Sequence, residues 1–331
     1  MEMVTVIVPM YNEERYILDC LNAILSQDYQ GSMEVLVIDG GSTDASRQIV
    51  HRVMSESRIP IRLLCNPKRI VPTSLNMGIR AAQGDIVVRV DAHSVIEKDY
   101  VRKCVEYLQS SGADNVGGLM RPIHNQTRIG QSIALAMSCP FGVGTGKFHY
   151  SEREEFVDTV YLGAYRKSTL LALGGYDETF LRNQDYELNY RIRRAGGKIL
   201  LTPAIKSQYY TRSSLRKLWS QYLQYGFWKV QMLRKHPRSV RGRQLVPPVF
   251  VLILLFNGAL SAISSLAAWV FVLVVASYLS LSLAFSFSIA ARKGWRYLPI
   301  LPVIFACLHL SWGLGFLYSL AQLTFQWLVR R

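Results

Sequence analysis

Acidic residues are missing from the C-terminal part of this 331-residue sequence. All 23 aspartates and glutamates lie at or before Glu187, whereas the 38 lysines and arginines divide evenly, with 19 on each side of that position. Residues 1–187 therefore carry a net charge of −4 (19 − 23), and residues 188–331 carry +19. Such a basic segment is typical of a nucleic-acid-binding protein or of a membrane protein whose cations face anionic lipid.

Two long segments of this basic part lack charge altogether. No charged side chain occurs in residues 246–291 or 297–329. A helix that crosses a bilayer needs about 20 apolar residues, so the first run has room for two such helices and the second for one more. Pro299, Pro302 and the C-terminal arginines leave open whether the second run crosses. We therefore expect a transmembrane region of two to three spans over residues 245–331, and no nucleic-acid partner.

The distribution of basic residues predicts which side of the membrane the rest of the chain occupies. Lysines and arginines cluster in residues 206–243 and 292–296, on either side of the first uncharged run. The positive-inside rule places both clusters in the cytoplasm. We expect a multi-pass protein of the inner (cytoplasmic) membrane, with residues 206–244 as a basic juxtamembrane segment. Within it, residues 214–233 form an amphipathic pattern that is typical of a helix lying on membrane lipids.

Signatures of several other protein classes are absent. The five cysteines are scattered without a CxxC pair, which argues against a disulfide framework or a zinc cluster. The start of the chain has the pattern of a strand and not of a cleavable signal peptide. Neither a GxGxxG turn nor a Walker lysine is present, so the dinucleotide-binding and P-loop classes are excluded.

The N-terminal part instead alternates short apolar strands with helical patterns. Strands are expected at residues 4–8, 34–38, 61–65 and 86–90. This alternation predicts a mainly parallel sheet with helices on both faces. Ligands of such sheets bind beyond the carboxyl ends of the strands, so the polar residues that follow each strand are candidates for a common site.

Two of these candidates also have an ordinary structural explanation. Asp39 with the glycines after it fits a turn, and the serine and threonine that follow fit a helix N-cap. In "NQDYEL", Asn183 or Asp185 fits the N-cap of an amphipathic helix. Together, however, the candidates offer a carboxylate for a base, a cation for a diphosphate and an acid for a metal ion.

The motifs resemble those of a known family. The stretches are "VIVPMYNEE", "VIDGGSTDAS" and "NMGIRAAQGDIVVRVDAH". They resemble the nucleotide-binding half of family 2 glycosyltransferases with the GT-A fold, and residues 161–199 resemble the acceptor half. "SSLRKLWSQYLQYGFWK" and "HLSWGLGF" are similar to the membrane-attached glucosyltransferases of succinoglycan-type exopolysaccharide assembly. The resemblance implies a cytoplasmic GT-A catalytic domain at residues 1–205, divided near residue 120 into a nucleotide-binding half and an acceptor half.

The resemblance also implies roles for individual residues. Those expected to bind the nucleotide are Pro9, Tyr11, Glu13, Asp39, Arg69 and Asp91. Those expected to bind the acceptor are Asn183, Gln184, Arg212, Gln224 and Trp228. Asp185 matches the catalytic base, and Asp91 with His93 matches the Asp-x-Asp motif that holds a divalent cation, Mn²⁺ or Mg²⁺. Trp228 fits a membrane-interface tryptophan nearly as well.

His93 departs from the family pattern because it occupies the second acidic position. Three roles stay open for it: direct ligation of the ion, a hydrogen bond to a phosphate oxygen, or packing at the surface. Imidazole suits Mn²⁺ better than Mg²⁺, which prefers oxygen ligands. Phe227 likewise replaces the arginine of the Gln-x-x-Arg-Trp motif of processive synthases, which argues against a processive enzyme.

The function that these features imply is an inverting transfer of a hexose from a UDP-sugar. The expected acceptor is a polyprenyl-diphosphate-linked saccharide, in exopolysaccharide or surface-glycan assembly. Asp185 serves as the general base, and one base without a second nucleophilic carboxylate favours single displacement. Two alternatives stay open: a polyprenyl-monophosphate glycosyltransferase, in which the lipid phosphate itself attacks, and a sugar-nucleotide-binding membrane scaffold without catalysis.

Overall fold

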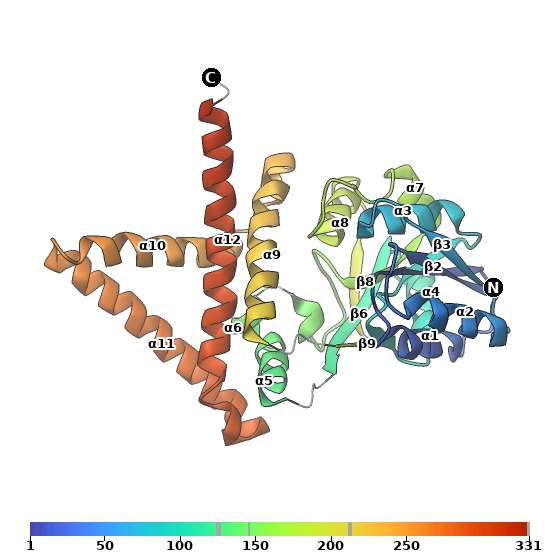
Figure 1. Cartoon of the computed structure of the whole chain (residues 1–331), viewed down its shortest axis with the longest axis horizontal. Coiled ribbons are helices and arrows are strands. Elements are labelled where there is room, and N and C mark those ends of the chain that lie inside the picture. Colours follow the sequence, from blue (N-terminus) through green and yellow to red (C-terminus); the bar gives the residue numbers. More distant parts are fainter. Residues whose placement is uncertain (124–126, 145, 211–213, 330–331) are drawn as a thin grey trace. The chain divides into compact units, whose positions relative to one another are not determined.

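The computed structural model describes residues 1–123, 127–144, 146–210 and 214–329. The chain divides into two compact units (Figure 1). The first comprises residues 1–123 and 146–210, and the second comprises residues 124–145 and 211–331. Residues 124–145 thus belong to the second unit, although the expected catalytic domain included them.

A mixed sheet forms the centre of the first unit. Its described strands run in the order β3-β2-β1-β4-β8-β6-β9-β5, with β7 paired to β9. Their bounds are β1 Val4–Met10, β2 Met33–Asp39, β3 Ile61–Cys65, β4 Ile86–Arg89, β5 Ser94–Ile96, β6 Asn115–Ile123, β7 Glu155–Phe156, β8 Tyr161–Arg166 and β9 Ile199–Tyr210. The first four are parallel, β8 is antiparallel to β4 and β6, and β9 is parallel to β6. The mixed, mainly parallel sheet expected from the sequence is confirmed.

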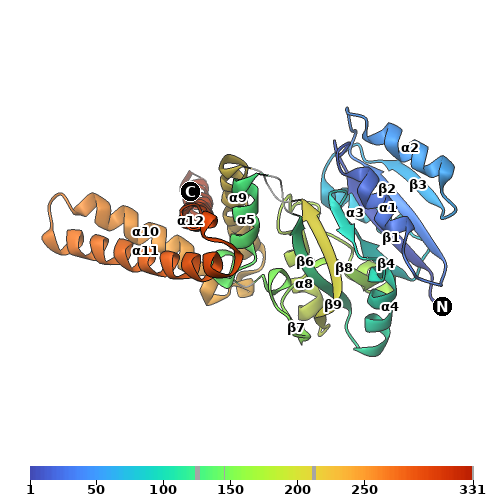
Figure 2. The ribbon, with the colours of Figure 1, turned by 90° about the horizontal axis from the view of Figure 1, so that it is seen from below.

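Helices cover both faces of this sheet (Figure 2). They are α1 Ile17–Leu25, α2 Ser46–Glu56, α3 Val71–Ala81, α4 Tyr100–Ser110, α7 Lys167–Ala172 and α8 Gln184–Arg194. Alternate residues of β1 face opposite sides: Val6 packs in one core with α1, α2 and α4, and Ile7 packs in the other with α3, α7 and α8. Burial on both faces explains why the first strands are nearly continuous apolar runs.

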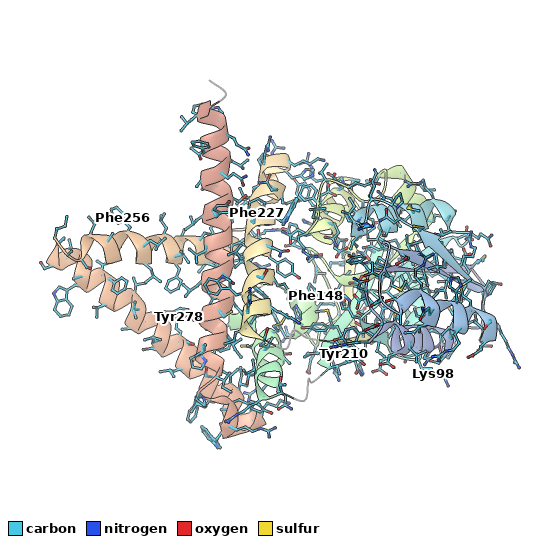
Figure 3. All side chains as sticks on the ribbon, in the orientation of Figure 1. Lys98, Phe148, Tyr210, Phe227, Phe256 and Tyr278 are labelled. Atoms are coloured by element: carbon cyan, nitrogen blue, oxygen red, sulfur yellow. The ribbon has the colours of Figure 1, made fainter. Side chains whose placement is uncertain are left out.

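The second unit is helical. It contains α5 Arg128–Met137, α6 Pro140–Val143, α9 Leu215–Lys235, α10 Val246–Leu260, α11 Ser265–Lys293 and α12 Leu301–Val329. Three helical segments, residues 242–260, 265–293 and 301–328, are long and apolar enough to cross a membrane. Large apolar side chains are exposed along α10 and α11, including Phe256 at 62% and Trp269 at 73%. Phe256 is labelled on α10 in Figure 3. Residues 301–329 of the second uncharged run form one continuous helix, because Pro302 lies in the first turn of α12, where proline is tolerated.

Glycines bring the helix backbones of this unit close together. A Cβ at Gly226 of α9 would lie 2.0 Å from the carbonyl oxygen of Trp312, and a Cβ at Gly315 of α12 would lie 2.0 Å from that of Leu223. A Cβ at Gly313 would lie 2.6 Å from the carbonyl oxygen of Pro247 in the first turn of α10. The "HLSWGLGF" motif is therefore where α12 contacts both α9 and α10. The apolar face of α9, expected to lie on lipid, includes Leu218, Tyr222 and Val230, which are buried.

A histidine joins three helices of the second unit. The Nδ1 atom of His309 on α12 lies 3.0 Å from the hydroxyl of Tyr278 on α11, and its Nε2 atom lies 2.7 Å from the carbonyl oxygen of Phe141 on α6. The Phe141 ring also stacks on Phe285 at 4.8 Å between centroids. This pair of polar contacts fixes the short helix α6 against α11 and α12.

We predict that Gly226→Ala destabilises the second unit, because the added methyl group would force α9 and α12 apart. Overpacking of this kind typically costs about 1–3 kcal/mol. Gly258→Ala on α10 is the matched control, because its methyl group would meet only the Phe271 ring, at 3.4 Å. The measurement is the apparent melting temperature of each variant in detergent at one scan rate. Equal melting temperatures for the two variants would contradict the tight α9–α12 contact.

Candidate active site

The loops at the carboxyl ends of the first strands are held together by hydrogen bonds. The Asn12 amide donates to the Ser42 hydroxyl at 2.9 Å, and the Thr43 amide donates to the Asn12 side-chain oxygen at 2.8 Å. The Asn66 amide donates to the carbonyl oxygen of Asp39 at 2.7 Å. The loops after β1, β2 and β3 therefore form one edge, as the order of strands requires.

Asp39 ends β2 within this edge and is fully buried. Its Oδ1 atom accepts hydrogen bonds from the Ser42 amide at 3.0 Å and the Ser42 hydroxyl at 2.6 Å. Its Oδ2 atom lies 3.6 Å from Arg47 Nε and accepts no hydrogen bond from the described residues. A buried carboxylate oxygen without a hydrogen bond is costly, so this atom is suited to accept one from a ligand.

Three of the other expected nucleotide contacts line the same edge. Pro9 pairs in register with Ile38 near the end of β1, and Tyr11, two residues later, is 49% exposed. A Cβ at Gly41 would lie 3.4 Å from Arg69 Nε, so the arginine side chain lies against the glycine turn. The structure thus brings an exposed aromatic ring, a carboxylate oxygen without a hydrogen bond from the described residues, and a surface cation to one edge.

Arg89 is a buried cation between two of the expected functional carboxylates. It is the last residue of β4, and its Nε atom donates to Asp91 Oδ1 at 2.8 Å. Its Nη1 atom donates to Asp185 Oδ1, in the first turn of α8. The second oxygen of Asp91 accepts a hydrogen bond from the Tyr161 hydroxyl at 3.2 Å. The expected cation ligand and the expected base therefore share one guanidinium.

The pKa values of the Asp91 and Asp185 carboxylates are shifted in opposite directions. Burial would raise the pKa of Asp91. The positive charges of Arg89 and His93, together with hydrogen bonds from Arg89 and Tyr161, outweigh this effect and hold that pKa below its ordinary value. Burial raises the pKa of Asp185, and the charge of Asp91 adds to this increase against the opposing charge of Arg89. The Asp185 side chain is 28% exposed, compared with 13% for Asp91. Asp91 is thus suited to hold a cation and Asp185 to accept a proton.

Glu13 and His93 form a second pair at this edge. The Nδ1 atom of His93 lies 3.0 Å from Glu13 Oε1. The structure therefore brings Glu13, expected to contact uridine, to the histidine after Asp91. No group of three or more histidine, cysteine or acidic side chains among the described residues could hold a metal ion by itself. A cation here would need ligands from the substrate as well.

The two acidic residues in the first turn of α8, Asp185 and Glu187, have different partners. Asn183 occupies the N-cap position in a left-handed conformation, with φ of 60°, and Gln184 is buried beside it. The Glu187 carboxylate bonds Arg191 at 2.7 and 2.8 Å, and Arg191 donates to the carbonyl oxygens of Leu173 and Gly175. Glu187 therefore stabilises the local fold, whereas Asp185 faces Arg89 and Asp91.

The remaining acceptor candidates lie elsewhere in the chain. Arg212 falls outside the described residues. Gln224 and Trp228 are on α9 of the second unit, where the Gln224 amide donates to the Ser220 hydroxyl at 3.4 Å. The Trp228 ring contacts Phe227 with 6.0 Å between centroids. Their acceptor roles stay predictions.

Arg89 and Tyr161 are site residues that the sequence reasoning missed. Arg89 lies within the apolar strand expected at residues 86–90, and its charge within "IVVRV" is the signal that the sequence offers. A charged residue inside a parallel strand that is buried on both faces must be paired, so it indicates carboxylates nearby. Tyr161 carries no comparable signal.

Comparisons with known proteins identify the family and the fold of the chain. A model of glycosyl transferase family 2 matches residues 5–160. The chain is 30% identical over 313 residues to succinoglycan biosynthesis protein ExoA of Rhizobium meliloti (strain 1021), covering 94% of this chain and 93% of that protein. It is 31% identical over 247 residues to a dolichyl N-acetyl-α-D-glucosaminyl phosphate 3-β-D-2,3-diacetamido-2,3-dideoxy-β-D-glucuronosyltransferase of Methanococcus voltae, covering 71% and 75%. The mannosyltransferase PcManGT of Pyrobaculum calidifontis, solved with GDP-Man and Mn²⁺, has a similar fold, with a TM-score of 0.60, 20% identity, and 96% and 87% coverage.

We predict that Asp39→Asn weakens UDP binding by about 10–100-fold, equivalent to about 1–3 kcal/mol. The amide oxygen can keep the two Ser42 hydrogen bonds, while the amide nitrogen replaces the free oxygen and opposes the imide N–H of uracil. Binding of CDP should weaken less or improve, because N3 of cytosine is an acceptor. Calorimetry with both nucleotides is the measurement. Asp28→Asn, which alters a carboxylate paired with Arg102 before β2, is the control. An unchanged UDP-to-CDP preference in Asp39→Asn would contradict the assignment.

Proposed function

Because this chain belongs to glycosyltransferase family 2 and has the GT-A fold, we propose that it transfers a hexose from a UDP-sugar to a lipid-linked saccharide with inversion. The observation that carries this proposal is the convergence of Asp91 and Asp185 on Arg89. Transfer from a sugar nucleotide requires a base at the acceptor hydroxyl and a positive charge at the departing diphosphate. Asp185 as the base and Asp91 as a ligand of a cation would meet these two needs. Their positions on either side of one guanidinium, and the raised pKa of Asp185 beside the lowered pKa of Asp91, support these roles.

The hydrogen-bonding capacity of Asp39 supports uracil as the donor base. One of its oxygens is occupied by Ser42, and the other has no hydrogen bond from the described residues. One free acceptor matches the single imide N–H of uracil, whereas guanine presents two neighbouring donors. Tyr11 and Arg69 supply an aromatic surface and a cation at the same edge, which suit the base and the diphosphate.

Asp91 and His93 fit a divalent cation that is also bound by the diphosphate. Each oxygen of Asp91 accepts one hydrogen bond, and a carboxylate has about four lone-pair sites in all. If Nδ1–H of His93 donates to Glu13, the lone pair lies on Nε2, an arrangement typical of metal-binding histidines. The bound cation would act as a Lewis acid on the leaving diphosphate.

The acceptor proposal rests on the helical unit. Three helical segments able to cross a membrane suit a substrate that is confined to the bilayer, and the basic clusters favour a catalytic unit on the cytoplasmic side of the inner membrane. Of the two relatives above, one is named for succinoglycan biosynthesis and the other for transfer to a dolichyl phosphate sugar. A polyprenyl-diphosphate-linked saccharide in polysaccharide assembly is the acceptor that we propose.

The experiment that tests this function is turnover by Asp185→Asn with a lipid-linked acceptor, measured beside a UDP binding isotherm. Loss of the base should lower kcat by about 10²–10⁴-fold, while UDP affinity stays close to wild type because the nucleotide edge is formed by other residues. Asp99→Asn is the control, because Asp99 occupies the N-cap position of α4 and pairs with Lys103. Turnover within about fivefold of wild type would remove Asp185 from the mechanism. It would then favour the polyprenyl-monophosphate reaction, which needs no base.

We further predict that turnover falls by about 10² or more in excess EDTA, because the diphosphate loses its Lewis acid. Mn²⁺ should restore activity at least as well as Mg²⁺, since imidazole binds Mn²⁺ more readily. His93→Asp supplies a second oxygen ligand and should shift the preference toward Mg²⁺. The measurement is initial rate against the concentration of each ion for both proteins. Full turnover in EDTA would contradict the cation, and an unchanged Mn²⁺-to-Mg²⁺ preference would contradict ligation by His93.

A further inference from the structure

We propose that Arg89 is a positioning residue that fixes the Asp185 carboxylate against the donor-site carboxylate Asp91. The inference rests on the function proposed above. It concerns a residue in neither the base motif nor the cation motif.

The position of Arg89 allows it to join two distant segments of the chain. Its side chain is 6% exposed and extends from the end of β4. Asp91 lies two residues further along the chain, whereas Asp185 lies in the first turn of α8. The guanidinium uses Nε for the first carboxylate and Nη1 for the second, so each carboxylate has its own donor. A planar guanidinium can hold this geometry, whereas a lysine ammonium supplies only a single charged nitrogen.

The charges explain why both carboxylates depend on this one cation. Two neighbouring, partly buried carboxylates repel each other, and each would lose a charged hydrogen-bond partner if Arg89 were removed. Asp91 keeps the Tyr161 hydroxyl on its other oxygen. Among the described residues, Arg89 is the side chain that donates a hydrogen bond to the Asp185 carboxylate. We therefore expect loss of Arg89 to affect Asp185 more than Asp91.

The arrangement also assigns the two oxygens of the base. Oδ1 of Asp185 is held by Arg89, so Oδ2 is the atom that accepts the proton of the acceptor hydroxyl. As that proton moves to Oδ2, the hydroxyl oxygen forms a bond to the anomeric carbon. The bond from this carbon to the diphosphate oxygen breaks, and UDP leaves with the electron pair. Arg89 contacts neither the acceptor hydroxyl nor the anomeric carbon in this scheme, and it acts through the orientation of Asp185.

The test is a double-mutant cycle of Arg89→Met and Asp185→Asn, read by transfer from a labelled UDP-sugar to lipid-linked acceptor. Misplacement of a catalytic group costs about 10–10²-fold, so Arg89→Met should lower kcat by that factor with UDP and Mn²⁺ affinity within about threefold. In the Asp185→Asn background, the same substitution should change kcat by less than about threefold, because the base through which it acts is already gone.

Arg62→Met is the matched control. Arg62 on β3 bonds the buried Glu34 at 2.8 Å, so this substitution also breaks an arginine–carboxylate pair of the sheet, away from Asp185. It should leave kcat within about threefold in both backgrounds. If Arg89→Met does not bind UDP, the cycle is run with Arg89→Lys, which keeps the charge and should give a smaller loss that again disappears in the Asp185→Asn background.

Equal losses from Arg89 substitution in the two backgrounds would overturn the proposal, as would a loss of UDP or Mn²⁺ affinity in Arg89→Lys that parallels its loss of kcat. Either result would assign Arg89 to the donor site or to general stability. The proposed function fails by a different result, namely full turnover by Asp185→Asn alone. The two failures are therefore distinguishable in one set of proteins.

Discussion

A guanidinium buried between two carboxylates is the interaction on which the arrangement of the site depends. A cation in a strand covered on both faces is unfavourable unless it is paired, and Arg89 is paired with Asp91 and Asp185. The same contact brings the start of α8 to the end of β4. The geometry of the candidate active site therefore follows from a requirement of stability, because leaving either carboxylate or the arginine unpaired would be costly.

Much of the first unit could be predicted from the sequence, for reasons that the structure makes clear. The four strands expected from apolar runs are β1 to β4. Burial on both faces gives β1, β2 and β4 their strong signal, whereas β3 at the edge of the sheet is only partly buried. β6, β8 and β9 were not expected as strands from their residues. β6 contains Gly117 and Gly118, where a Cβ would meet Val160 at 2.6 Å and the carbonyl oxygen of Ile205 at 1.9 Å. Only glycine fits where neighbouring atoms approach this closely. Because glycine has no side chain, it weakens the sequence pattern by which a strand is identified.

The site could be predicted as a list of positions, but its internal pairing could not. Asp39, Asp91 and Asp185 are identified by motif, and the structure gives each a distinct environment. The contact of Glu13 with His93 joins loops that are 80 positions apart in sequence, so no local pattern reports it. The same holds for Phe141 and His309, whose contact places the helices after β6 in the second unit.

The return of the chain from α6 to the sheet has a consequence for how the protein is made. The ribosome completes α5 and α6 before β7, and it completes α9 to α12 only afterwards. During that interval Phe141 lacks Phe285, Phe305 and His309, which later surround it. The nascent protein thus holds an unfinished apolar surface between β6 and β7, and transiently exposed apolar surface is prone to aggregate. If everything beyond β9 were removed, Phe141 would never gain these partners. A secreted or soluble version of the catalytic unit would therefore need α5 and α6 redesigned as well.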